Sequence, residues 1–308
     1  MKLFVGSVAA TIGTAAAIRY HQLGLTLSHY DARGHLIVAR RIIDSITPGW
    51  QQIGAVWLPL PHLLNMLPVQ IDAFYRSGAS AVAISIASFV LATVAIAWIV
   101  RRLTRSTAAS LAAAAVFALN PNVVYLQATP MTEPLLLGLT ALGVALLIDH
   151  AVGRAPDATV GVVLALACLT RYEAWPVTYA ALGAAAWTRW RRGDALPAAV
   201  RDVVRIAVYP TVAILGFALF SRVVVGQWFV SSDFFVPENK AQGLPIVAIE
   251  EIVWGTRELS GRLMIVLGVA GCAALLVAGL FSRTRAHALI ALSLAATAAV
   301  PWAAFIDG

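Results

Sequence analysis

GASAVAISIASFVLATVAIAWIV, residues 78–100, contains no charged side chain. An α-helix needs about 20 apolar residues to cross the hydrocarbon of a bilayer, so this stretch predicts a membrane-spanning helix. The rest of the chain has a similar composition, because 60% of its 308 residues are hydrophobic and only 12% are charged. The mean hydropathy of +0.82 is far above that of a water-soluble domain of this length. We therefore expect an integral membrane protein.

Nine stretches are apolar enough to be interpreted as spans, although those at 108–119, 159–169 and 174–187 are short. In chain order the nine run over 3–23, 78–100, 108–119, 132–148, 159–169, 174–187, 206–225, 263–281 and 286–305. The first can also be interpreted as a signal peptide, but the spans that follow make a signal anchor the simpler interpretation. Neither an internal repeat nor a separate soluble domain can be placed between them. The sequence therefore predicts an all-α, polytopic membrane protein with about nine transmembrane helices, residues 1–308 forming a single transmembrane domain.

Charged residues are distributed unevenly between the two ends of these spans. With the N-terminus in the cytoplasm, twelve of the 22 Lys and Arg residues fall on the inner side and nine on the outer side, with Arg19 within the first span. This inner excess supports the orientation through the positive-inside rule. Eleven of the 15 Asp and Glu residues then face outward. We expect a multi-pass protein of the cell membrane, inner or plasma membrane, with its active site on the external or periplasmic side.

The net charge of +7 does not indicate a nucleic-acid partner. The basic residues lie in short clusters between apolar runs and form no continuous basic face, which a nucleic-acid-binding protein needs. The two cysteines, Cys168 and Cys272, lie far apart within apolar runs, so they give neither a disulfide framework nor a metal-ligand spacing. The lipid bilayer is the partner that the composition predicts.

Two long external loops are expected, at about 28–77 and about 226–261. The first opens with residues 30–46, whose apolar side chains recur at three- and four-residue intervals and predict an amphipathic helix on the membrane surface. The following stretch, 47–68, is TPGWQQIGAVWLPLPHLLNMLP, whose prolines and tryptophans suit a broken interfacial segment better than another crossing. The second loop contains a further amphipathic stretch at 246–259.

Asp31 and His35 belong to SHYDARGH, residues 28–35, an unusually polar stretch for so apolar a chain. Four residues apart, they share one face of the predicted surface helix. A carboxylate at a partly desolvated interface can act as a general base, and an imidazole one turn away can orient it or tune its pKa. The structural alternative is that Asp31 caps the helix while His35 extends its ring toward the membrane surface.

Three further sites lie at the same predicted outer surface. Glu133 stands in TEP at the start of a span, where the helix dipole favours a carboxylate and Thr132 can supply the cap. Arg171 and Glu173 stand in TRYEAW, a tight turn in which the guanidinium either binds a phosphate or carboxylate ligand or pairs with Glu133 or Glu173. Lys240, in PENK, either meets an anionic headgroup or is solvated. Ionisable residues near membrane depth by default mark a functional site.

The order of these motifs resembles a known family. A first span, then YDARGH on an external helix, a later TEP and an outer RYE turn resemble the GT-C superfamily of polyprenyl-phosphate-sugar-dependent glycosyltransferases. The similarity is to the protein mannosyltransferase and aminoarabinose-transferase-like branch, glycosyltransferase family 39-like, and it covers about residues 3–259. It implies a GT-C-like fold and an inverting hexosyl- or pentosyltransferase that uses a polyprenyl-phosphate-linked sugar.

The resemblance also implies roles for individual residues. The acidic residue of the first external loop becomes Asp31, which removes the proton from the acceptor hydroxyl. The predicted catalytic residues are Asp31, His35 and Glu133, and the predicted donor-phosphate or substrate ligands are Arg171, Glu173, Lys240 and Arg33. No cofactor is required, and a divalent metal bound through Asp31 and His35 is an open alternative. The acceptor is an unknown glycan, lipid or protein.

The sequence departs from the family pattern in two places. Many members have an adjacent Asp-Glu pair in the first loop, whereas Ala32 follows Asp31 here. Members commonly have further spans or a C-terminal soluble domain, so we also consider one half of a split enzyme that a second polypeptide completes. The competing functions are a transporter or flippase of a lipid-linked or small anionic substrate, and a noncatalytic membrane subunit. A transporter is expected to place ionisable residues at mid-membrane in broken helices.

Overall fold

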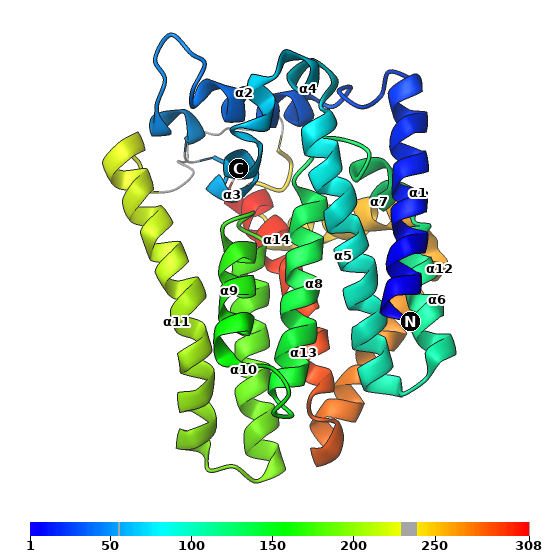
Figure 1. Cartoon of the computed structure of the whole chain (residues 1–308). Coiled ribbons are helices and arrows are strands. Elements are labelled where there is room, and N and C mark those ends of the chain that lie inside the picture. The colour runs from blue at the N-terminus through cyan, green and yellow to red at the C-terminus, as the bar shows by residue number, and fades with distance from the viewer. Residues whose placement is uncertain (55, 229–238, 308) are drawn as a thin grey trace.

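The protein is a bundle of long helices with short helices across one end (Figure 1). The structure, a computed structural model, describes residues 1–54, 56–228 and 239–307. Within those ranges the regular elements are all helical. The prediction of an all-α membrane protein is therefore confirmed at the level of helix content and hydropathy.

Six helical segments of the described ranges are long and apolar enough to cross a membrane. They are α1 (Lys2–Gln22), α5 (Ala79–Thr104), α8 (Glu133–His150), α11 with a following π-helical turn (Leu196–Val225), α12 (Pro245–Phe281) and Ala288–Ile306. The expectation of about nine spans therefore exceeds what these helices support.

The three predicted spans that do not qualify are the short ones. α6 (Thr107–Ala118) and α9 (Asp157–Cys168) have 12 residues each. At 1.5 Å per residue such a helix is about 18 Å long, well short of a hydrocarbon core of about 30 Å. α10 (Ala174–Arg192) has 19 residues but ends in three arginines within its last turn. α9 and α10 pack against each other, α8 and α11, so they fill the bundle between longer helices.

Three predicted spans also have other boundaries or another form in the structure. α11 (Leu196–Phe220) begins well before residue 206. α12 joins the predicted surface helix 246–259 and the predicted span 263–281 in one element, but Gly261 takes φ 76° and ψ 157° and breaks it there. This conformation is accessible to glycine because it has no Cβ. The predicted 286–305 span becomes a series of short elements, namely η4 (Arg283–Arg285), α13 (Ala288–Leu292), η5 (Ser293–Ala298) and α14 (Ala299–Asp307).

The first loop lies over one end of the bundle, as Figure 1 shows for α2, α3 and α4. Its elements are α2 (Tyr30–Arg41), η1 (Trp50–Ile53), α3 (Pro59–Asn65), η2 (Pro68–Gln70) and α4 (Asp72–Ser77). Pro59 and Pro68 stand at helix starts, where the missing N–H costs no hydrogen bond. The helix predicted from residue 30 is present but ends at Arg41 rather than at residue 46, and its place on a membrane surface stays a prediction. The described residues of 47–68 form the expected broken segment. The short α7 (Pro121–Leu126) lies in the next loop at the same end.

α8 sits at the centre of the bundle and fixes the position of Glu133. It is the most buried of the six long segments, at 72% of its apolar window. It approaches α5 so closely that a Cβ on Gly138 would lie 2.7 Å from the Ser88 carbonyl oxygen. Leu147 of α8, Leu164 of α9 and Ile206 of α11 belong to the same buried apolar cluster. This packing holds the end of α8 that carries Glu133 under the first loop.

Candidate functional site

Arg171 is the centre of a charged cluster under the first loop. It lies in the turn between α9 and α10, and its Nη1 is 3.1 Å from Glu133 Oε1 while its Nη2 is 2.9 Å from Glu173 Oε1. Nη1 also donates a hydrogen bond to Thr132 Oγ1 at 3.1 Å. All three charged side chains are about a quarter exposed or less, at 26%, 26% and 21%. The structure therefore brings together TEP and RYE, two segments far apart in the sequence.

The charge balance of this cluster is negative. Burial acts to lower the pKa of Arg171, but Glu133, Glu173 and Asp31 outweigh it and raise that pKa. Arg171 is therefore firmly cationic and faces three carboxylates. The ion pair that the sequence offered as a structural alternative is present, and it involves both glutamates. One oxygen of Glu133, Oε2, is buried without a hydrogen-bond partner among the described residues.

Asp31 reaches this cluster from α2. Its charge acts on Arg171 electrostatically, but no described side chain forms an ion pair with its carboxylate within 4 Å. The helix cap is supplied by His29, whose Nδ1 accepts a hydrogen bond from the Asp31 backbone N–H at 3.2 Å. The alternative in which Asp31 caps its own helix is therefore wrong, because the cap lies two residues earlier. The Asp31 carboxylate stays available to a ligand.

His35 lies one turn further along α2 and is buried, with 5% of its surface exposed. Its Nδ1 is 3.2 Å from Nε2 of His62 in α3, and its ring centre is 4.2 Å from that of Trp57. Gly34 permits this packing, since a Cβ there would lie 2.7 Å from the Trp57 ring. Burial, followed by the charges of His62, Arg171 and His29, lowers the pKa of His35 to about 3. His35 is therefore a neutral interior side chain rather than one that extends toward the membrane surface.

The first loop is joined to the Arg171 turn through its backbone. The Leu60 N–H of α3 donates to the Leu169 carbonyl at 2.9 Å, directly before that turn. Within the loop, Arg40 of α2 is 2.6 Å from Asp72 of α4 and 2.8 Å from Asp44. These contacts hold α2, and with it Asp31, over the end of the bundle.

Arg33 and Lys240 are not brought into the cluster. The Arg33 side chain is exposed and its Nε donates to the Leu27 carbonyl at 2.7 Å. Lys240 is exposed in the turn before α12, next to Asn239, whose side chain binds the Phe305 carbonyl at 2.8 Å. Neither cation forms an ion pair with a described carboxylate. Both are cations at the cluster end of the bundle without a salt-bridge partner in the described ranges.

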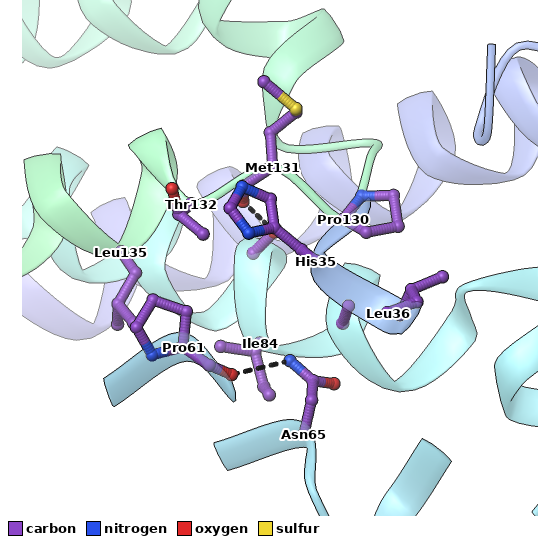
Figure 2. Close-up of a pocket in the computed structure, with 11 residues that line it drawn as sticks. His35, Leu36, Pro61, Asn65, Ile84, Pro130, Met131, Thr132 and Leu135 are labelled. Atoms are coloured by element: carbon purple, nitrogen blue, oxygen red, sulfur yellow. Dashed lines mark hydrogen bonds between the residues drawn. The ribbon is translucent and has the colours of Figure 1, made fainter. Parts of the chain in front are cut away.

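A small cavity lies beside the cluster, between α2, α3, α5 and the start of α8. Figure 2 shows the ring of His35 among its lining residues, beside Thr132 and Met131. Its walls also include Asn65 and Ser85. The cavity leaves about 20 Å³ for the centres of water molecules, which is room for one water and far too little for a sugar.

The sequence interpretation missed two residues of this region. The sequence places His62 only in a broken proline-rich segment. Its partner His35 is 27 residues away, and residue spacing predicts contacts only between neighbours along one element. Thr132 was considered only as a cap, yet its side chain makes no capping bond and instead accepts from Arg171. A histidine inside PLPHLL was the signal that could have drawn attention to His62.

The site combines a carboxylate without an ion pair, Asp31, with a guanidinium held by two glutamates. The Asp31 carboxylate can accept a proton from a hydroxyl or bind a polar ligand through hydrogen bonds. In the described part of the chain, no three His, Cys, Asp or Glu side chains are placed to hold one metal ion. A metal bound by Asp31 and His35 stays a prediction.

Fold and site together define the class. This is an all-α membrane protein in which long apolar helices carry a partly buried charged cluster at one end, under a cover of short helices. No family model, curated protein or solved structure matches the chain.

Proposed function

We propose that the protein is an integral membrane glycosyltransferase of the GT-C type. It transfers a sugar from a polyprenyl-phosphate-linked donor to an acceptor at the outer face of the cell membrane, with inversion. The observation that carries this proposal is the convergence of Asp31, Glu133 and Arg171 from three separate segments at one end of the bundle. These are the segments whose motifs resemble the family. A lipid-linked donor presents its phosphate at this depth, where the covering helices meet the apolar spans.

Asp31 is the best candidate for the base. An inverting transfer by one in-line displacement needs one group that takes the proton from the acceptor hydroxyl. Glu133 and Glu173 are both bound to Arg171, whereas Asp31 forms no ion pair with a described residue. Its carboxylate oxygens can therefore accept a hydrogen bond from the hydroxyl of the acceptor substrate. Glu133 then holds Arg171 in position beside Asp31, and His35 supports α2 from inside.

The donor phosphate needs cations to neutralise its charge, and a cation that is not already paired with carboxylates suits this role best. A phosphate that approaches Arg171 has to displace one of its two carboxylates, so this guanidinium acts mainly as the positioning group for Glu133 and Glu173. Among the residues that the structure describes, no carboxylate forms an ion pair with Lys240 or Arg33. We propose these two cations, which lie outside the cluster, as ligands of the donor phosphate, because positive charge near a leaving group lowers the barrier.

The charge pattern of the spans favours an enzyme over a transporter or flippase. A transporter site is expected near the middle of the membrane, in broken helices. Residues 79–100 and 263–281 contain no charged side chain, and the charged cluster lies at one end of α8. Ligand chemistry at that end requires no passage through the bundle.

The test is turnover of polyprenyl-phosphate sugars, both hexose and pentose, by the purified protein, measured as release of polyprenyl phosphate. Asp31→Asn is expected to lower turnover by roughly 100- to 10,000-fold, the usual contribution of a general base. Asp44→Asn is the matched control, because Asp44 is an exposed carboxylate of the same loop that pairs with Arg40. Normal turnover by a folded Asp31→Asn variant reassigns the base. Donor binding without turnover by the unmodified protein supports the transporter, and absence of binding supports a noncatalytic subunit.

A further inference from the structure

The hydrogen bonds of the two buried histidines fix where their protons lie. His62 Nδ1 is 3.2 Å from the Leu58 carbonyl oxygen, which can only accept. His62 Nδ1 therefore carries the hydrogen. In the neutral ring this leaves a lone pair on His62 Nε2.

The position of the ring hydrogen of His35 follows from that of His62. Its Nδ1 is 3.2 Å from the lone pair of His62 Nε2, so His35 Nδ1 carries the hydrogen and donates it. The lone pair of neutral His35 is then on Nε2. That atom is buried and has no hydrogen-bond partner among the described residues. A buried acceptor left without a donor destabilises the folded state, because it loses the hydrogen bonds that water would supply.

His35 also lines the cavity described above, and the cavity contains a suitable donor. The Thr132 hydroxyl oxygen accepts from Arg171, so its own hydrogen is free to point elsewhere. Ser85 donates its hydroxyl hydrogen to the Thr129 carbonyl at 3.0 Å, which leaves its oxygen able to accept. Both residues line the cavity together with His35, and Figure 2 labels Thr132 beside the His35 ring. The residues that line this one-water space therefore include one available donor, Thr132, and two available acceptors, His35 and Ser85.

We propose that this cavity is a binding site for one buried water molecule, which accepts a hydrogen bond from Thr132 and donates to His35 Nε2 and Ser85. The water completes a directed chain of hydrogen bonds that runs from Arg171 through Thr132, the water, His35 and His62 to the Leu58 carbonyl. It satisfies the lone pair of His35 and joins α2 to the start of α8. A buried water with three partners is the usual arrangement in protein interiors.

Every link of this chain requires both rings to be neutral. Protonation of His35 would turn Nε2 from an acceptor into a second donor facing the water, and the new positive charge would be repelled by Arg171. Burial lowers the pKa of His62 to about 4 and that of His35 to about 3, the latter with contributions from His62, Arg171 and His29. The arrangement therefore persists through neutral pH.

The test reads tautomers directly. In protein labelled with ¹⁵N-histidine and held in lipid nanodiscs at pH 7, both rings are expected to show protonated Nδ1 and unprotonated Nε2 by NMR. His35→Asn and His62→Asn assign the signals. Magnetisation from water is expected to reach the His35 ring. A protonated Nε2 on either ring, or no transfer from water, overturns the proposal.

Two buried threonines, Thr132 directly before α8 and Thr140 within it, provide the matched comparison. Thr132→Val removes the donor to the water and is expected to shift the His35 Nε2 resonance, and Thr132→Ser to restore it. Thr140→Val is the control, because Thr140 is also buried in α8 but does not line the cavity. Equal shifts in the two valine variants contradict the water bridge. If Thr132→Val fails to fold, the histidine tautomers and the transfer of magnetisation from water in the unmodified protein still test the proposal. None of these measurements depends on turnover, so they stand apart from the proposed reaction.

Discussion

Arg171 Nη1 lies 3.1 Å from Glu133 Oε1, and this contact joins the turn between α9 and α10 to the start of α8. The same guanidinium also holds Glu173 at 2.9 Å. One side chain thus balances two partly buried carboxylates, so its removal leaves both without a counter-charge.

Arg171→Met is expected to destabilise the protein by about 2–3 kcal/mol. This lies at or below the low end for breaking a buried ion pair, because the Arg171 and Glu133 side chains are each 26% exposed. Glu133→Gln in the same chain is expected to recover part of the loss. Thermal unfolding in detergent measures both. Arg76→Met is the control, since its 3.8 Å pair with Asp72 is 80% and 60% exposed and is expected to contribute less than about 1 kcal/mol. Equal effects of the two substitutions contradict the importance of the cluster.

Stability is expected to fall on acidification through the two buried histidines. Their pKa values, about 3 for His35 and about 4 for His62, lie below the ordinary 6.5. The unfolded chain therefore binds protons that the folded chain does not, between about pH 6.5 and pH 4. Each histidine then removes roughly 1.4 kcal/mol of stability per pH unit, and stability rises as pH rises.

Apparent melting temperatures from pH 8 to pH 4 test this dependence. The double variant His35→Gln with His62→Gln is expected to give a flatter pH profile, because glutamine does not titrate. His21→Gln serves as control, since His21 is exposed on α1. An unchanged profile in the double variant means that other groups cause the acid sensitivity.

The close approach of α5 and α8 gives a packing prediction. Gly138→Ala places a Cβ 2.7 Å from the Ser88 carbonyl oxygen, a backbone atom that cannot move aside cheaply. We expect a loss of about 1–3 kcal/mol, the usual cost of overpacking. Gly183→Ala in α10 meets nothing within 4 Å, so it is expected to be neutral or to stabilise by up to about 1 kcal/mol. Thermal unfolding distinguishes the two variants, and equal behaviour contradicts the close contact.

The orientation can be tested by labelling single cysteines with a membrane-impermeant maleimide. Arg33→Cys in the first loop and Arg191→Cys near the end of α10 are expected to react from opposite sides of the membrane, the first from outside. Cys272 is exposed and is replaced by serine beforehand, whereas Cys168 is buried. Labelling of both positions in intact cells would overturn the topology.

The long uncharged runs and the amphipathic first-loop helix were predictable from the sequence, because hydropathy and periodicity act locally. The number of candidate spans was not, since residues 108–119 and 159–169 are as apolar as the longer helices and differ from them only in length. The meeting of Glu133 with Arg171 followed from the topology. The pairing of His35 with His62 did not, because it depends on how the loop folds back over the bundle.

The bond from the Leu60 N–H to the Leu169 carbonyl has a consequence for biogenesis. The first loop is synthesised early, but the turn that anchors it and the arginine at the centre of the cluster emerge from the ribosome only after α9. During translation the first loop therefore lacks its hydrogen bond to Leu169 at first. The charged cluster can form only after Glu173 has been synthesised.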